Sequence, residues 1–124
     1  MIARLIDSVI LIDHLHGVQK AGRYLSSLNP ADTAISVITR AQILVGVEES
    51  DEALVKMLLD QYHLLTIDGS IADRCAVLRR RYGWKLPDSF QAALALHHSA
   101  RLVTRNTRDF NPRMHSFVEV PYRL

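Results

Sequence analysis

Three aspartates and one glutamine stand where short apolar stretches end or helices begin: Asp7, Gln42, Asp88 and Asp109. Carboxylates gathered at one point bind hard cations such as Mg²⁺ and Mn²⁺, which take oxygen ligands and keep several waters. Enzymes that cut phosphodiester bonds use such ions to activate water and to stabilise charge on the phosphate. The three carboxylates therefore predict a metal site for phosphodiester chemistry, and Gln42 adds a neutral carbonyl oxygen to the set.

The elements that must position these residues alternate along the chain. Short apolar runs predict strands at residues 2–6, 34–37, 63–67, 101–104 and 117–120. Helical periodicity predicts a helix after Asp7 and further helices at residues 18–28, from Thr39 onward, at 51–62, 71–82 and 87–99. Strands separated by helices need crossover connections. We therefore expect a single α/β domain over residues 1–124, with helices on both faces of a central, mostly parallel sheet.

The four candidate positions converge on one edge of such a sheet. In open parallel sheets, ligands gather beyond the carboxyl ends of the strands. Asp7 follows the first predicted strand, Gln42 lies less than two helical turns past the second, and Asp109 follows the fourth together with Asn106. Asp88 opens the helix that leads into the fourth strand. The order of these residues along the chain thus matches a shared site.

Each candidate also has a structural interpretation. Asp7 can cap the helix that follows it, and Asp88, directly after Pro87, can interact with the positive end of a helix dipole. Asn106 and Asp109 are common turn formers. Their joint placement at the ends of elements favours the site.

Composition restricts the class of protein. The chain has 124 residues, 48% of them hydrophobic, and no apolar run reaches the ~18 residues of a membrane span. One cysteine, Cys75, excludes an internal disulfide and is expected to be a packing residue in a cytoplasmic protein. The formal charge is only +2, which permits a nucleic-acid partner if the basic residues cluster. The run Arg79–Arg81 is expected to form a solvated helix face, and Trp84 to pack.

Four segments resemble those of one known family. Residues 5–13 (LIDSVILID), 35–46 (ISVITRAQILVG), 85–93 (KLPDSFQAA) and 102–110 (LVTRNTRDF) are similar, in this order, to the segments of the PIN-domain ribonucleases. The similarity is greatest to the VapC-type toxins of bacterial toxin–antitoxin pairs. The resemblance covers nearly the whole chain and implies a PIN-like three-layer α/β/α fold.

The resemblance also implies roles for individual residues. The catalytic positions are Asp7, Gln42, Asp88 and Asp109. The three aspartates are the expected ligands of Mg²⁺ or Mn²⁺, with Ser8 and Asn106 as accessory polar residues. RNA is the implied substrate, and the arginines that flank the acidic residues are candidates to hold it: Arg105, Arg108 and Arg113. A small VapB-type antitoxin and a second copy of the chain are the implied partners.

Gln42 departs from the family pattern, which has a glutamate at this position. Glutamine removes one negative charge but keeps an oxygen that can accept a hydrogen bond from metal-bound water. Two interpretations follow. The chain is a ribonuclease with weakened metal binding, or it is a PIN-like domain that binds RNA or an antitoxin without cleaving.

Overall fold

Five short strands form one sheet in the computed structural model, which describes residues 1–124. They are β1 (Arg4–Ile6), β2 (Thr33–Ser36), β3 (His63–Leu65), β4 (Arg101–Val103) and β5 (Val118–Glu119). Their order in the sheet is β3-β2-β1-β4-β5, and every neighbouring pair is parallel. The sheet is therefore wholly parallel, where the sequence predicted a mostly parallel one.

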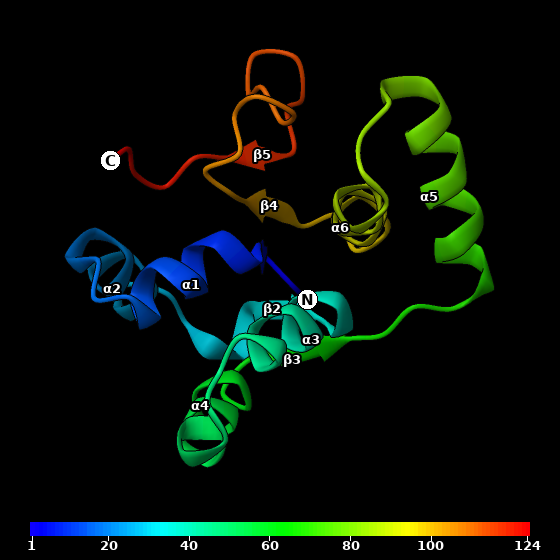
Figure 1. The fold of residues 1–124 in the computed structure, drawn as a ribbon. Coiled ribbons are helices and arrows are strands. Elements are labelled where there is room, and N and C mark those ends of the chain that lie inside the picture. Colours follow the sequence, from blue (N-terminus) through cyan, green and yellow to red (C-terminus); the bar gives the residue numbers. More distant parts are fainter.

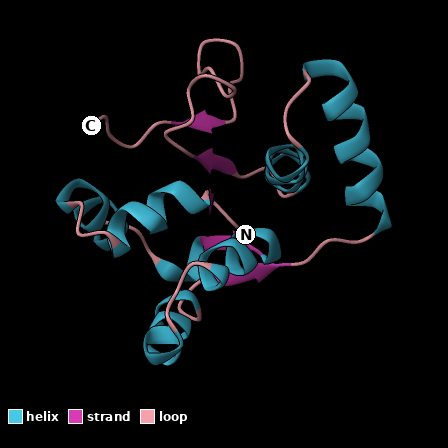
Figure 2. Ribbon diagram, in the orientation of Figure 1, coloured by secondary structure: helices cyan, strands magenta, loops and turns pink.

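Six α-helices connect the strands and cover the sheet (Figure 1). They are α1 (Ser8–Leu15), α2 (Gln19–Ser26), α3 (Val37–Val45), α4 (Glu52–Leu59), α5 (Gly69–Tyr82) and α6 (Leu86–His97), with short 3-10 helices at Pro30–Asp32 and Glu49–Asp51. Figure 2 shows how helices alternate with strands along the chain. The α/β class is confirmed.

The strands are shorter than the apolar runs that predicted them. Residues 63–67 were expected to form a strand, yet β3 ends at Leu65. Its only neighbour is β2, and Leu65 pairs with Ser36, after which the chain turns into α3. Without a partner beyond Ser36, the third strand cannot continue.

Two apolar clusters form the core, one on each face of the sheet. Leu5 belongs to the cluster under α5 and α6, whereas Ile6 belongs to the cluster under α1, α3 and α4. Leu102 and Val103 divide in the same way, as alternate residues of a strand must. Cys75 is buried in the first cluster, which confirms its packing role.

The middle of the sheet is where the strand order places a ligand site. The chain builds β2 and β3 on one side of β1, and β4 and β5 on the other. A crevice opens between neighbouring strands at such a reversal. Ile6 pairs with Val103, so the residues that follow them, Asp7 and Thr104, lie side by side at the carboxyl ends of β1 and β4. None of the helices is both long and apolar enough to cross a membrane.

Candidate active site

Asp7 is held rigidly at the end of β1. It is 7% exposed and is the N-cap residue of α1, where its Oδ1 accepts a hydrogen bond of 2.9 Å from the Ser8 amide. Oδ1 also accepts from Gln91 Nε2 at 3.2 Å, and Oδ2 accepts from Thr104 Oγ1 at 2.7 Å. A carboxylate offers roughly four acceptor positions, so these three bonds leave about one for another ligand. The capping and site interpretations of Asp7 are therefore compatible.

A chain of hydrogen bonds joins Asp7 to Asp109. Thr104 Oγ1 donates to Asp7 and accepts from the Asn106 amide at 3.0 Å. Asn106 Nδ2 then donates to Asp109 Oδ2 at 3.0 Å. The Asp109 carbonyl accepts from Trp84 Nε1 at 2.9 Å, which fixes this turn against the core. Asn106 thus orients the Asp109 carboxylate.

Asp88 lies in the first turn of α6, close enough to the other two aspartates for their charges to affect its ionisation. Burial raises the pKa of its carboxyl above the ordinary value of 3.8, and the charges of Asp7 and Asp109 raise it further. Lys85 acts in the opposite direction but does not cancel this effect. The structure therefore places the three carboxylates near enough for the charges of Asp7 and Asp109 to act on Asp88.

Gln91 and Thr39 complete the polar surroundings of Asp7. Gln91 follows Asp88 by three residues on α6 and is 2% exposed. Its Nε2 donates to Thr39 Oγ1 at 2.8 Å as well as to Asp7, while its Oε1 is buried without a partner. Sequence reasoning missed Gln91, Thr39 and Thr104. A polar residue on an otherwise apolar helix face, or directly after an apolar strand, was the available signal.

Ser8 is the other residue expected to be an accessory polar group. The contact from Ser8 to Asp7 comes from its backbone amide, as in any helix cap. The hydroxyl that bonds to the carboxylate belongs to Thr104.

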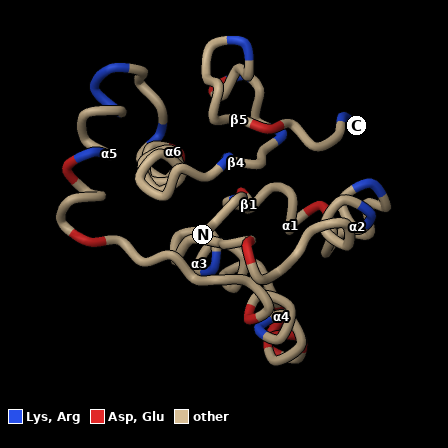
Figure 3. The backbone as a smooth tube through the Cα atoms, turned by 180° about the vertical axis from the view of Figure 1, so that it is seen from behind, with Lys and Arg blue, Asp and Glu red and all other residues tan.

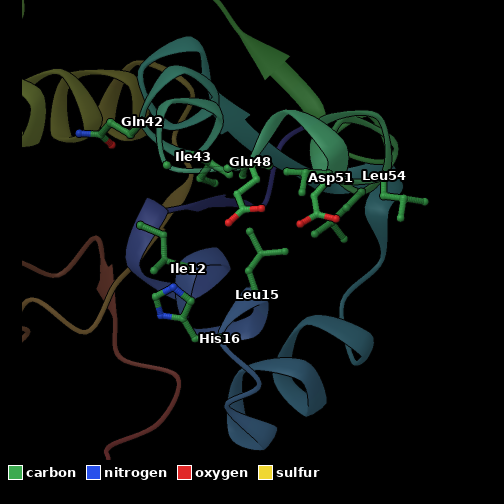
Figure 4. A pocket seen from close by; sticks show the side chains of 12 residues that line it. Ile12, Leu15, His16, Gln42, Ile43, Glu48, Asp51 and Leu54 are labelled. Atoms are coloured by element: carbon green, nitrogen blue, oxygen red, sulfur yellow. The ribbon is translucent and has the colours of Figure 1, made fainter.

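Gln42 lies at the margin of the site. It is exposed on α3, one turn beyond Thr39, and it borders a groove of about 640 Å³ between α1, α3 and α4. In Figure 4 its side chain points away from the apolar side chains of that groove. Thr39, not Gln42, is the α3 residue that joins the hydrogen bonds around Asp7.

The three arginines predicted to hold RNA have different surroundings. Arg105 forms a bidentate ion pair with Asp13, with Nε–Oδ2 at 2.7 Å and Nη2–Oδ1 at 2.9 Å. Asp13 is 7% exposed and also accepts from the Tyr122 hydroxyl at 2.8 Å. Arg108 and Arg113 are exposed in the loop between β4 and β5. Arg105 therefore has a structural partner, whereas the other two are accessible.

The donor set suits a hard divalent cation. Asp7 retains about one acceptor position, Asp109 Oδ1 accepts no hydrogen bond from the chain, and all three groups supply oxygen. The mutual repulsion that raises the pKa of Asp88 is the kind that a cation relieves. As arranged, no three His, Cys, Asp or Glu side chains are close enough to hold one ion. The chemistry of the residues fits a metal, while their spacing is wider than that of a formed site.

Comparisons with known proteins agree on one family. The PIN-domain profile matches residues 4–112. Ribonuclease VapC19 of Mycobacterium tuberculosis is 33% identical over 114 residues, which cover 86% of this chain and 91% of that protein. Ribonuclease VapC10 of the same organism is 32% identical over 112 residues, covering 86% and 84%.

Two solved structures share the fold of this chain. A toxin–antitoxin complex from Klebsiella pneumoniae contains a chain that matches with a TM-score of 0.91 and 36% identity, over 98% of this chain and all (100%) of that one. FitAcB from Neisseria gonorrhoeae matches with a TM-score of 0.80 and 22% identity, over 98% and 99% of the two chains. The second likeness concerns the fold alone.

Proposed function

Because the chain belongs to the PIN-domain family, among relatives that are VapC ribonucleases, we propose that it is a metal-dependent ribonuclease and the toxin of a toxin–antitoxin pair. The observation that carries the proposal is that three carboxylates lie near the carboxyl end of the sheet, close enough for their charges to interact although not close enough, as arranged, to hold one ion. Asp7 follows β1, Asp109 follows β4 and Asp88 opens α6, and the charges of the first two raise the pKa of the third.

In this proposal, some residues bind the metal or orient its ligands, and one accepts a proton from water. Mg²⁺ or Mn²⁺, when bound by Asp7, Asp88 and Asp109, supplies an activated water and stabilises charge on the scissile phosphate. Thr104 and Gln91 keep the Asp7 carboxylate in one orientation, and Asn106 does the same for Asp109. No hydrogen bond within the chain engages the Asp88 carboxylate, so we assign Asp88 the role of accepting the proton of the attacking water.

The antitoxin is proposed to occupy the groove between α1, α3 and α4 (Figure 4). Its walls are mainly apolar, and Glu48 and Asp51 stand at its rim. An amphipathic helix with basic residues beside its apolar face matches this lining. Gln42 lines this groove on α3, and α3 also packs against α6, the helix that carries Asp88, so we propose that a basic side chain of such a helix reaches the three carboxylates and competes with the metal.

The test is cleavage of purified total RNA by the protein, with Mn²⁺ and with EDTA. Cleavage that requires the metal and is lost in Asp88→Asn supports the proposal. Asp88→Asn is the preferred inactive control because the Asp88 carboxylate makes no hydrogen bond within the chain, whereas Asp7→Ala leaves Gln91 and Thr104 without their acceptor.

The alternative is a PIN-like domain that binds RNA or an antitoxin without cleaving. One observation favours it, namely a neutral amide at position 42 where the family has a carboxylate. Gln42→Glu separates the two functions. The alternative predicts no cleavage by the parent protein and a gain of Mn²⁺-dependent cleavage in the variant. Robust cleavage by the parent, unchanged in Gln42→Glu, would exclude the alternative.

A further inference from the structure

A group of exposed basic residues near the end of α5 has no carboxylate partners, unlike the basic residues that form the ion pairs of the molecule. Lys56 and the arginines at 4, 40, 101 and 105 have carboxylate partners. No carboxylate pairs with Arg80 or Arg81 in the last turn of α5, with Lys85, or with Arg108 or Arg113 in the loop between β4 and β5. All five are exposed, and together they are called the basic surface.

Aromatic contacts bring the parts of the basic surface together. The Tyr82 ring lies edge to face with His115 at a centroid distance of 5.0 Å, which joins the end of α5 to the loop that carries Arg113. Tyr82 also stacks on Trp84 at 4.5 Å and 16°. Figure 3 shows Lys and Arg at the end of α5 and in the loop before β5, on the same side of the molecule.

The basic surface borders the three carboxylates. Trp84, on which Tyr82 stacks, donates its indole N–H to the Asp109 carbonyl. The aromatic side chains at the end of α5 therefore contact the turn that carries one of the three carboxylates. Lys85 is the N-cap residue of α6, three residues before Asp88 in the first turn of that helix. Arg108 lies between Asn106 and Asp109 in sequence.

We propose that the basic surface binds the phosphate backbone of the RNA strand whose scissile bond lies at the carboxylates. This inference rests on the proposed ribonuclease function. Unpaired arginines and lysines that neutralise phosphates supply the sequence-independent part of nucleic-acid binding. Their place beside the carboxylates means that the strand is held next to the point where those carboxylates would otherwise repel its phosphates.

The contacts of Tyr82 indicate which part of the RNA is recognised. One face of the ring is covered by Trp84, and the Arg81 guanidinium lies 5.2 Å from the ring centroid. A base cannot stack there without displacing these neighbours. A guanidinium that lies over a ring keeps its N–H groups free for bidentate contact with a phosphate. The basic surface is therefore directed at phosphates rather than at base identity.

A purely structural explanation covers only part of the pattern. Cations in the last turn of a helix stabilise the negative end of its dipole, and Arg79 to Arg81 occupy that turn of α5. Arg79 donates to the Trp84 carbonyl, which accounts for its position. Lys85, Arg108 and Arg113 belong to other segments, so the α5 dipole does not explain them.

The experiment measures binding of a short fluorescein-labelled oligouridylate by fluorescence anisotropy in EDTA, where no cleavage occurs, over a series of KCl concentrations. The variant combines Arg80→Gln, Arg81→Gln and Arg113→Gln. The matched control is Arg23→Gln, because Arg23 is also an exposed arginine in the last turn of a helix, α2, and has no carboxylate partner. Thermal unfolding of each protein reports any effect on the fold.

For the triple variant we expect a Kd about tenfold higher, and a slope of log Kd against log salt reduced by about 0.7 for each phosphate that the protein no longer neutralises. The control keeps the Kd and slope of the parent. An unchanged slope in the triple variant, or an equal loss of affinity in the control, would overturn the proposal. The binding assay contains no metal, so its result does not depend on cleavage. A protein that binds RNA through the basic surface in EDTA but cleaves no RNA in the separate assay with Mn²⁺ would refute the ribonuclease proposal and leave the surface in place.

Discussion

Thr104 has more influence on the candidate site than its sequence position suggests. Its hydroxyl both donates to Asp7 and accepts from the Asn106 amide, so it sets the distance between the ends of β1 and β4. It is fully buried, and water cannot replace either bond easily.

We expect Thr104→Val to destabilise the protein by about 2 kcal/mol, because an isosteric methyl group leaves the buried Asp7 carboxylate and the half-buried Asn106 amide without this partner. Thr104→Ser, which keeps the hydroxyl, is the control and should lose less than half as much. Urea denaturation monitored by circular dichroism measures both. Equal stability of the valine variant and the parent would contradict the role given to this hydroxyl.

Asp88 should limit the stability of the metal-free protein above acidic pH. The pKa of the Asp88 carboxyl in the folded protein is raised above the 3.8 of the unfolded chain. Between the unfolded and the folded pKa, the folded protein binds more protons than the unfolded chain, so the stability falls as the pH rises from one pKa to the other. Asp88→Asn removes the effect. In EDTA we expect the variant to unfold a few degrees higher than the parent at neutral pH, and at the same temperature below pH 3.8.

The same substitution should weaken Mn²⁺ binding, since it removes a charged ligand. Calorimetric unfolding across the pH range and titration with Mn²⁺ test the two halves separately. Unchanged Mn²⁺ affinity would remove Asp88 from the metal site. A stability difference that does not vary with pH would show that the carboxylates do not repel one another.

At the residue scale, the sequence could indicate the carboxylates but not the groups that orient them. The sequence alone shows that Asp7, Asp88 and Asp109 are charged and lie at the ends of predicted elements. Gln91 and Thr39 acquire their role only when α6 and α3 pack together, and Arg105 could not be distinguished from Arg108 before its ion pair with Asp13 was known.

At the scale of elements, the class and approximate bounds of the helices and strands followed from periodicity and from residues such as Pro87 and Gly83. Gly83 adopts a positive φ of 72° at the end of α5, a conformation that favours glycine. The strand order was not predictable, because a crossover connection does not tell on which side of its predecessor the next strand adds.

The ion pair of Asp13 and Arg105 joins α1 to the loop after β4, and Tyr122 adds the C-terminal segment. Arg105 holds the pKa of Asp13 below 3.8 by hydrogen bonding, so the stability from this pair is present above that pH and is lost as the pH falls through the lowered pKa.

We expect Arg105→Ala to cost about 2 kcal/mol at neutral pH, less than for a fully buried pair because the Arg105 side chain is 28% exposed. Tyr122→Phe removes one hydrogen bond and should cost about 1 kcal/mol. Denaturant unfolding at neutral and acidic pH measures both, and the deficit of Arg105→Ala should shrink in acid. A deficit that persists in acid would mean that packing, rather than charge, accounts for it.

At the scale of the whole molecule, the two faces of the sheet differ in what they expose. The face under α5 and α6 leads to the basic surface, whereas the face under α3 and α4 carries exposed apolar side chains. Val45 is 87% exposed, Leu54 70% and Met57 69%. Ile43, on the same helix as Val45, is instead part of the core.

We expect the chain to form a homodimer at micromolar concentration, with Val45 and Met57 in the contact, because removing such exposed apolar surface from water is favourable. The double variant Val45→Glu, Met57→Glu should be monomeric by light scattering. It should unfold at nearly the parent's temperature, since both side chains are exposed. Met114→Glu, an exposed residue of the loop before β5, is the control and should remain dimeric. A parent protein that is monomeric under these conditions would exclude the dimer, and would leave the antitoxin as the partner proposed to cover this face.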